Sequence, residues 1–183
     1  FTFSDATGRC AVIELFNACE YLLDRQLADG HGARLALTGR GGEHTYAALH
    51  DMVVRMANGL RGLGLQPEQR VLMCMTDSPE FVAVYLAAMR MGAVPVPVST
   101  MMHADGLAEL IHDSRARVLV LTPEFAEIAN RAVAGGSELT AVVAVDIAPI
   151  VADLPVHSLG ELAAAAGDDE VYPTTVDSPA FWL

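Results

Sequence analysis

Two short glycine-rich stretches make phosphate binding the first chemistry to consider. They are Gly39-Arg-Gly-Gly42 and Gly62-Leu-Gly64, and glycine lets backbone N–H groups approach a phosphate closely. A GxGxxG loop of this kind follows a buried strand and opens a helix, and neither stretch stands in that context. We therefore interpret both as turn or helix-ending glycines. All 11 basic residues are arginine, so the chain has no lysine to grip a phosphate.

The histidines and cysteines lack the spacing of a metal site. No two histidines are four residues apart, as the HExxH motif requires, and Cys10, Cys19 and Cys74 contain no CxxC pair. Cys74 lies in an apolar run and is expected to be a small buried side chain. We therefore predict no metal ligands. The histidines, expected mostly at the surface or at helix caps, are His31, His44, His50, His103, His112 and His157.

Serine and acidic residues give no catalytic group either. The chain has no GxSxG nucleophile elbow, and Ser78 and Ser99 are expected to be a helix cap and a loop residue. Asp77 and Glu80 are three residues apart, which is the spacing of a helix capping box. We prefer the cap to a paired acid and base, and we predict no catalytic residue.

Composition is typical of a globular protein with an acidic surface. The 183 residues are 52% hydrophobic and carry a formal net charge of −12, and this length suits one domain or a large part of one. Nucleic acids and anionic membranes bind basic patches, so neither partner is expected. The sequence has no secretory signal and no run of about 18 apolar residues. We therefore expect a cytoplasmic protein.

Hydrophobic periodicity predicts alternating strands and helices. Asn17 and Glu20 have capping-box spacing, and Thr45 opens a longer helix whose apolar residues recur every three or four positions. Uniformly apolar runs are typical of strands covered on both faces of a parallel sheet, and Pro95 and Pro97 favour the edge of that sheet. The chain is therefore predicted to be α/β, with a mainly parallel sheet and helices on both faces. Helices are expected at about 18–28, 46–62, 80–91, 104–113, 123–133 and 159–166, and strands at about 35–37, 70–75, 93–98, 117–121, 141–145 and from 180 onward.

Four segments share their order and spacing with the motifs of a known family. They are His44-Thr-Tyr-Ala-Ala-Leu49, Gly64-Leu-Gln-Pro-Glu-Gln-Arg-Val-Leu72, Leu86-Ala-Ala-Met-Arg-Met-Gly-Ala-Val-Pro-Val-Pro-Val98 and Asp113-Ser-Arg-Ala-Arg-Val-Leu-Val120. Together they resemble the acyl-adenylate-forming superfamily of acyl-CoA synthetases, luciferases and peptide-synthetase adenylation domains. Phe16-Asn-Ala-Cys-Glu-Tyr-Leu-Leu-Asp-Arg25 looks most like the benzoate-CoA ligase branch.

The resemblance implies that residues 1–183 are the N-terminal part of the large domain of such an enzyme. Asp177-Ser-Pro-Ala-Phe-Trp-Leu183 resembles the strand that runs into the family's lysine-containing phosphate loop, and the sequence stops there. We expect that loop, the acid-binding pocket and the C-terminal domain to lie outside this chain. The chain alone is then expected to be inactive and to bind no cofactor tightly, with the missing remainder of the enzyme as its partner. Exposed apolar surface could also let copies associate.

The parent enzyme implied by the resemblance is a CoA ligase. It would use ATP, Mg²⁺ and coenzyme A to convert an aromatic or other carboxylic acid into its acyl-CoA through an acyl-adenylate, releasing pyrophosphate and then AMP. The loop Ser99-Thr100-Met101 resembles a segment near the coenzyme A channel. Some relatives carry an arginine where Met101 stands, so an apolar channel wall is expected here rather than a phosphate contact. From the residues alone, Met101 and Met102 line a binding surface or fill the core.

Other functions stay open at this point. A fatty acyl-CoA synthetase or a peptide-synthetase adenylation domain would share the same motifs. A stand-alone, non-catalytic α/β binding module would share the fold without the chemistry.

Overall fold

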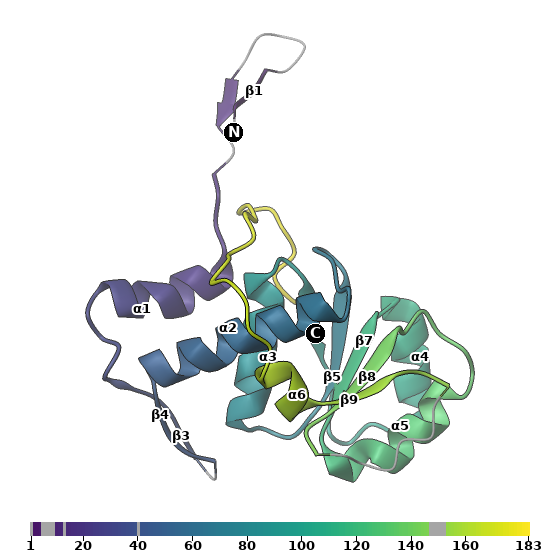
Figure 1. Cartoon of the computed structure of the whole chain (residues 1–183). Helices are drawn as coiled ribbons and strands as arrows, with labels where there is room; N and C mark the ends of the chain where they lie inside the picture. The colour runs from purple at the N-terminus through teal and green to yellow at the C-terminus, as the bar shows by residue number, and fades with distance from the viewer. Residues whose placement is uncertain (1, 5–9, 13, 40, 147–152) are drawn as a thin grey trace.

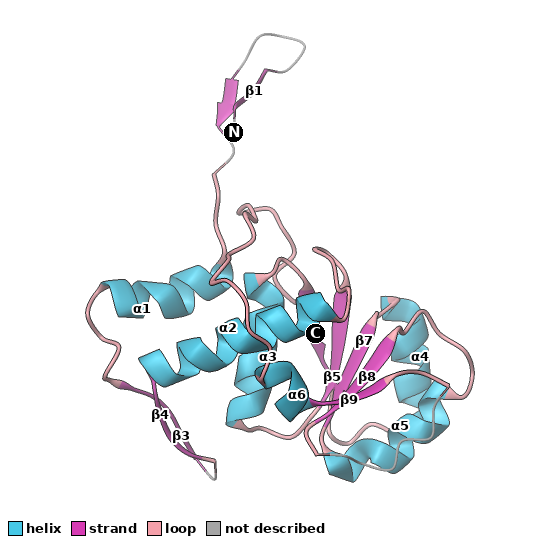
Figure 2. Cartoon of the chain, in the orientation of Figure 1, coloured by secondary structure: helices cyan, strands magenta, loops and turns pink. Residues whose placement is uncertain are grey.

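A five-stranded parallel sheet forms the centre of the chain in the computed structural model, which describes residues 2–4, 10–12, 14–39, 41–146 and 153–183. The strands lie in the order β6-β5-β7-β8-β9, and every neighbouring pair is parallel. Helices flank the sheet on both faces (Figures 1 and 2), which confirms the predicted α/β class. The strands are β5 (Arg70–Cys74), β6 (Val94–Pro97), β7 (Val118–Leu121), β8 (Ala141–Ala144) and β9 (Val156–Ser158).

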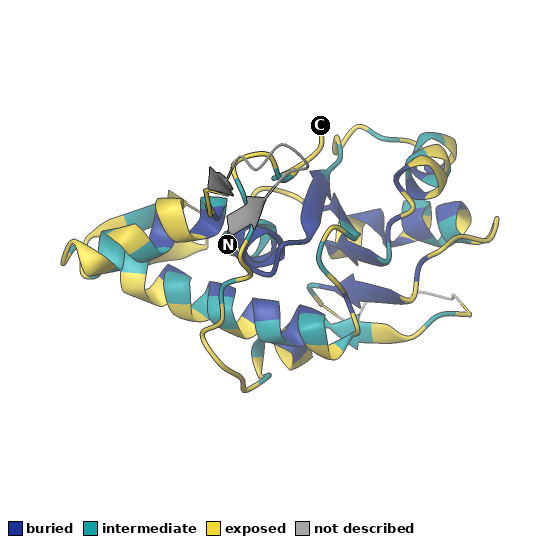
Figure 3. Cartoon of the chain, turned by 90° about the horizontal axis from the view of Figure 1, so that it is seen from above, coloured by how far each residue is buried: buried dark blue, intermediate teal, exposed yellow. Residues whose placement is uncertain are grey.

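Residues of the central strands alternate between two separate apolar clusters. In β5, Val71 and Met73 pack into one cluster, whereas Leu72 and Cys74 pack into the other. All four are at most 1% exposed, because the period-two alternation of a strand points its side chains to both covered faces. Figure 3 shows the strands as buried ribbons between helices with exposed outer sides. The uniformly apolar runs in the sequence follow from this arrangement.

Two layers of helices cover the sheet. α2 (Tyr46–Gly62), α3 (Pro79–Arg90) and α6 (Leu159–Ala163) pack on the face that carries Val71 and Met73. The other face is covered by α4 (Ala104–Ser114) and α5 (Ala126–Val133). Each layer buries one apolar stripe per helix, as the 3.6-residue period in the sequence predicts.

The N-terminal helical stretch runs from Ala18 to Ala28, as predicted. The Asn17 Oδ1 accepts hydrogen bonds from the N–H groups of Cys19 at 3.0 Å and Glu20 at 3.4 Å, so Asn17 caps this stretch. Its middle is a π-helical turn, and the stretch packs against α2. The remaining short helical elements are η1 (Glu20–Asp24), α1 (Arg25–Ala28) and η2 (Pro123–Phe125).

Helix α3 begins at a serine rather than at the aspartate before it. The Ser78 Oγ accepts a hydrogen bond from the Phe81 N–H at 3.2 Å. Pro79 takes the first helical position, and proline keeps the residue before it extended, which makes Ser78 the cap. The capping role of Ser78 is therefore confirmed, and the capping-box interpretation of Asp77 is wrong.

Hairpins in the N-terminal part add strands that the sequence analysis did not predict. The predicted strand at 35–37 extends to β3 (Leu35–Gly39), which pairs antiparallel with β4 (Gly42–Thr45). Gly42, with a φ of 94°, makes the tight turn possible. β4 has the sequence Gly-Glu-His-Thr, and its polarity hides it from a hydrophobicity pattern. A second antiparallel hairpin joins β1 (Thr2–Ser4) and β2 (Cys10–Val12).

The predicted strand from residue 180 onward is wrong. Residues 179–183 form neither a strand nor a helix, although the Trp182 N–H donates to the Pro95 carbonyl oxygen of β6 at 3.1 Å. That one bond fixes the segment beside the edge strand without forming a ladder. The predicted edge position of β6 is confirmed, since β6 ends the strand order. None of the helices in the described ranges combines the length and apolar character that crossing a bilayer requires.

The contact between α2 and α6 yields a test of the fold. A Cβ at Gly59 would lie 2.7 Å from the Leu162 carbonyl oxygen. Gly59→Ala should therefore destabilise the chain by about 1–3 kcal/mol, against the normal helix preference for alanine. Gly62→Ala, at the end of the same helix, meets no atom within 4 Å and should be neutral or stabilising by up to about 1 kcal/mol. Urea unfolding midpoints measure both, and equal midpoints for the two variants would contradict the packing described.

Candidate functional site

The chain reverses direction across the sheet between β5 and β7. From β5 it passes through α3, in one helical layer, to β6 on one side of β5. It then passes through α4, in the opposite layer, to β7 on the other side of β5. The loops after these strands diverge, and ligands of open parallel sheets bind at such a switch point, outside the carboxyl ends of the strands. This edge is the candidate functional site.

The hydroxyl and the backbone N–H of Thr122 join the ends of β5 and β7. Thr122, only 5% exposed, accepts a hydrogen bond from the Thr76 N–H on its Oγ1 at 3.2 Å. The Thr122 N–H in turn donates to the Cys74 carbonyl oxygen at 3.2 Å. These bonds satisfy backbone groups where the ladder ends. The ends of β5 and β7 are therefore held in fixed positions at the switch point.

Glu124, whose side chain is exposed, lies next to these two strand ends. Partial burial acts to raise the pKa of Glu124, but hydrogen bonds from its own backbone and from the Thr76 and Thr122 side chains outweigh this and hold the pKa below its usual value. Hydrogen bonds to the charged form favour that form. The sequence analysis placed Glu124 only at the start of a helix, because Thr76, one of the two threonines that bond it, lies at the end of a different strand.

The predicted channel loop lies after β6 on the same edge of the sheet. The Ser99 Oγ accepts a hydrogen bond from the Met101 N–H at 3.2 Å, and the Ser99 carbonyl oxygen accepts one from the Met102 N–H at 3.1 Å. Ser99 and Thr100 are exposed. The coenzyme A contact expected for these residues stays a prediction.

The two methionines of this loop have different environments. Met101 is 84% exposed, whereas Met102 packs against the cluster beneath α4 and α5. Met102 therefore packs with the core, and the binding-surface alternative stays a prediction for Met101 alone. Only Met101 presents an adaptable apolar side chain to solvent.

Neither of the two cysteines placed in the described core is suited to nucleophilic chemistry. Cys74 and Cys19 are at most 1% exposed. Burial raises the pKa of the Cys74 thiol to about 11 and that of Cys19 to about 12. The thiolate is the reactive form, so both act as small apolar side chains, as predicted for Cys74. Within the described ranges, no three His, Cys, Asp or Glu side chains are grouped to hold a metal ion.

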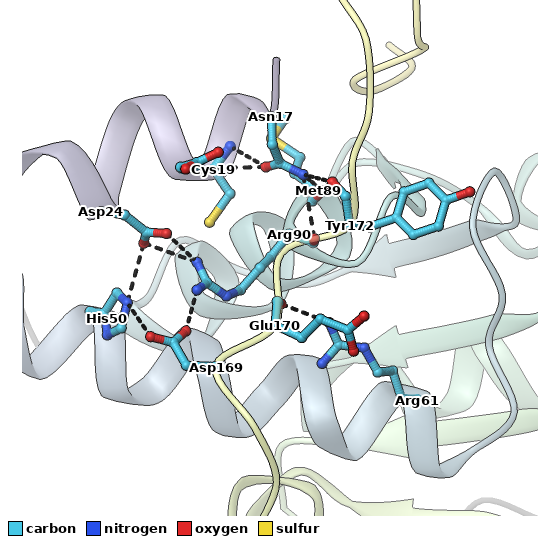
Figure 4. Close-up of polar contacts among 11 residues, drawn as sticks. Asn17, Cys19, Asp24, His50, Arg61, Met89, Arg90, Asp169, Glu170 and Tyr172 are labelled. Atoms are coloured by element: carbon cyan, nitrogen blue, oxygen red, sulfur yellow. Dashed lines mark hydrogen bonds and ion pairs between the residues drawn. The ribbon is translucent and has the colours of Figure 1, made fainter. Parts of the chain in front are cut away.

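A buried ion cluster lies away from this edge, and the sequence analysis missed it (Figure 4). Arg90, at the end of α3 and 1% exposed, donates from Nη1 to both Asp24 carboxylate oxygens at 2.9 and 2.7 Å, and from Nη2 to Asp169. The His50 Nε2 lies 3.2 Å from Asp24 Oδ1 and 3.5 Å from Asp169 Oδ2. Arg90, Asp24, Asp169 and His50 are called the Arg90 cluster below. Their separation in the sequence, from residue 24 to residue 169, left no local signal.

One surface cavity does not suit a carboxylate. It has a volume of about 390 Å³ and lies between α2, α3, α6 and the loop after β8. Asp51, Glu80 and Asp146 surround it, and its Arg55 is already paired with Asp51 at 2.8 Å. An acid anion would be repelled there.

Comparison with known proteins gives consistent results in sequence and in fold. A family model described as AMP-binding enzyme matches residues 23–183. A 4-hydroxybenzoate–CoA/benzoate–CoA ligase of Rhodopseudomonas palustris is 31% identical over 168 residues, which cover 91% of this chain and 30% of that protein. The crystal structure of a benzoate CoA ligase from Burkholderia xenovorans has a TM-score of 0.80 at 27% identity, over 92% of this chain and 32% of that one.

A second solved structure supports the fold. An anthranilate CoA ligase in complex with anthranoyl-AMP has a TM-score of 0.80 at 21% identity, over 91% of this chain and 32% of that chain. The chain thus spans 30% to 32% of the length of these three relatives.

The threonine tie at the switch point can be tested by removing one hydroxyl. Thr122→Val leaves the Thr76 N–H without its partner and should destabilise the chain by about 1–3 kcal/mol. It should also raise the pKa of Glu124 toward its usual value, since one hydrogen bond to the carboxylate is lost. NMR titration of Glu124 and urea unfolding measure the two effects. The control is Thr140→Val, an exposed threonine before β8, which should leave Glu124 unchanged.

The pH dependence of this effect has a defined sign. Because the folded-state pKa of Glu124 is lowered, its contribution to stability is present above the unfolded-state pKa. That contribution is lost as the pH falls through the folded-state pKa. The stability difference between the wild type and Thr122→Val should therefore shrink in acid. A difference that grows below about pH 4 would contradict the hydrogen bonding described.

Proposed function

Since the chain belongs to the family of AMP-binding enzymes, we propose that it is the N-terminal part of the large domain of an ATP-dependent aryl-CoA ligase. The observation that supports this most is the agreement of its five-stranded parallel sheet with the fold of a benzoate CoA ligase over nearly the whole chain. The relatives named above act on aromatic acids, which supports the aryl branch over the fatty acyl and peptide-synthetase branches. Benzoate is the substrate that we propose to test first.

The proposed reaction has two steps. A carboxylate oxygen of the acid attacks the α-phosphorus of ATP, and pyrophosphate leaves to give an acyl-adenylate. The thiol sulfur of coenzyme A then attacks the acyl carbon, and AMP leaves with the electron pair of the broken bond. Mg²⁺ would neutralise charge on the phosphates. Positioning and charge neutralisation dominate catalysis of this kind.

In this proposal the chain supplies a frame rather than reacting groups. Its described polar residues at the carboxyl edge hold the strand ends in place, as the bond between Thr76 and Thr122 does. The phosphate loop and the acid pocket would come from the rest of the enzyme. The isolated chain is therefore expected to have no ligase activity.

Met101 is proposed to form part of the wall of the coenzyme A channel. Its side chain is 84% exposed on a loop whose backbone is fixed by Ser99. The contact would be apolar, with the hydrocarbon arm of coenzyme A rather than its phosphates. Ser99 and Thr100 would line the same wall.

The activity is tested with a longer polypeptide that contains this chain and the remainder of the enzyme. Incubation with ATP, coenzyme A and benzoate should yield benzoyl-CoA and AMP in equal amounts, detected by chromatography. Omission of any one substrate should abolish the product. The 183-residue chain alone should yield none. Turnover of a fatty acid or an amino acid in place of aromatic acids would assign the enzyme to another branch, and turnover of no acid would overturn the ligase proposal.

The channel role is tested by Met101→Ala in that longer polypeptide. Loss of one apolar contact should raise the KM for coenzyme A about three- to tenfold, the effect of roughly one buried methionine contact. The KM values for ATP and benzoate should stay unchanged. Leu22→Ala removes a comparably apolar side chain, 53% exposed on the N-terminal helix, and serves as the control. An unchanged KM for coenzyme A would remove Met101 from the channel.

A further inference from the structure

The C-terminal segment depends on side-chain contacts for its position. Residues 165–183 form no helix, and their one bridge pairs Thr175 with Leu15. A segment without regular structure has few backbone bonds of its own to fix it. The contacts that hold it therefore decide where it lies.

The Arg90 cluster follows directly after the bond that the Asn58 Nδ2 donates to the Asp168 carbonyl oxygen at 3.1 Å. Asp169 joins the Arg90 guanidinium, which Asp24 holds from the other side. His50 of α2 contacts both carboxylates. The cluster thus joins the N-terminal helical stretch, α2, α3 and the segment at one point.

Further bonds follow directly after the cluster (Figure 4). The Tyr172 N–H donates to the Arg90 carbonyl oxygen at 2.9 Å, and the Tyr172 carbonyl oxygen accepts from the Asn17 Nδ2 at 3.1 Å. A Cβ at Gly92 would lie 2.5 Å from the Tyr172 ring, so the ring rests on that glycine. The Arg61 Nη2 also donates to the Glu170 carbonyl oxygen at 2.9 Å, so Asp169 lies within a continuous row of contacts.

The members of the cluster differ in how easily they can leave it. The Arg90 side chain is 2% exposed and that of Asp24 is 22%, but that of Asp169 is 57% exposed. An arginine left buried without a partner is strongly destabilising. If Asp169 leaves, Arg90 keeps both bonds to Asp24, so the fold can persist. Asp169 is the one member that can move to water at modest cost.

The cluster holds more carboxyl groups than guanidinium groups. Asp24 and Asp169 supply two carboxyl groups against the single guanidinium of Arg90. The groups that face His50 are Asp24 from η1, Asp169 from the segment and Arg90 behind both. Cys19 also neighbours Arg90, and burial keeps its thiol protonated.

We propose that the Arg90 cluster is an ion-pair clasp that positions residues 169–183 and that opens by release of Asp169 alone. The inference rests on the proposed function in one respect: in the proposed ligase this segment leads to the ATP phosphate site. Asp169, Arg90 and His50 are then positioning residues for that site.

The lone tryptophan of the chain reports on the segment without any assay of activity. Trp182 is 43% exposed, and its backbone N–H donates to the Pro95 carbonyl oxygen of β6. The centre of its ring lies 5.5 Å from the Arg70 Cζ. Release of the segment would remove these contacts and open the ring to a quencher. Acrylamide quenching of Trp182 therefore measures docking of the segment in the 183-residue chain itself. A failure of the ligase proposal would leave this readout unaffected.

The first experiment compares two neighbouring charge-neutralising variants. Asp169→Asn removes the clasp contact, and the Asp168→Asn control removes the same charge one residue earlier, where only the backbone oxygen is bonded, by Asn58. Asp169→Asn should raise the quenching of Trp182 and the hydrogen exchange of the Tyr172 and Thr174 amides about two- to fivefold, the range expected for one partly exposed ion pair. Far-UV circular dichroism should stay unchanged. Equal quenching in the two variants would overturn the proposal.

The second experiment uses the wild-type chain and so does not depend on how a variant folds. Raising the salt concentration from about 0.05 M to about 1 M should increase quenching of Trp182, because salt screens a partly exposed ion pair such as that of Asp169. In Asp169→Asn the increase should be smaller. No response in the wild type, or the same response in Asp169→Asn, would overturn the proposal.

Discussion

A strand that is buried on both faces has no water to bond its backbone, and this constraint governs the arrangement of the chain. β5 meets it by pairing with β6 on one side and β7 on the other, so all of its ladder groups are satisfied. Parallel partners must be reached by crossovers, and here the crossovers are α3 and α4. The two helices cover opposite faces of the sheet, and each buries the apolar side chains that its face presents. The helical layers thus follow from the need to enclose β5.

The same constraint moves polar chemistry to the ends of the strands. Within the sheet, residues such as Leu72 and Val120 are fully buried, and a polar group there would lose its solvation. Beyond the carboxyl ends, Thr76 and Thr122 share a hydrogen bond, Glu124 is held as a carboxylate, and Met101 is exposed. The fold is therefore a rigid frame with its adaptable groups on loops, as in many α/β enzymes. A frame of this kind is consistent with a role in positioning rather than in bond making.

Among the charged side chains of the described residues, Arg90 is the one that is buried. Its guanidinium lies between the N-terminal helical stretch, α2 and the C-terminal segment, and Asp24 and Asp169 supply the charges that make this possible. Burial opposes the charged state of Arg90, but the neighbouring carboxylates outweigh it and raise its pKa. A buried ion pair adds little net stability compared with apolar packing. What it adds here is a specified geometry, because the guanidinium joins Asp24 of the N-terminal helical stretch to Asp169 of the C-terminal segment.

The sequence by itself determined four of the five strands of the parallel sheet, β9 excepted, and most of its helices. Burial on two faces leaves uniformly apolar runs such as 70–75, and burial on one face leaves stripes such as that of α2. Ser78 and Thr45 were also readable, since a helix cap is a local interaction between near neighbours. The strand predicted from residue 180 onward is wrong, because pairing with a neighbouring strand is not a local interaction. The apolar residues there lie beside β6 with one backbone hydrogen bond instead of a ladder. Only the tertiary structure separated Met101 from Met102, brought Thr122 to Thr76, and assembled Arg90 with Asp24, His50 and Asp169. The packing of whole helices and strands decides which residues meet in each of these contacts. Their spacing along the chain therefore does not predict them.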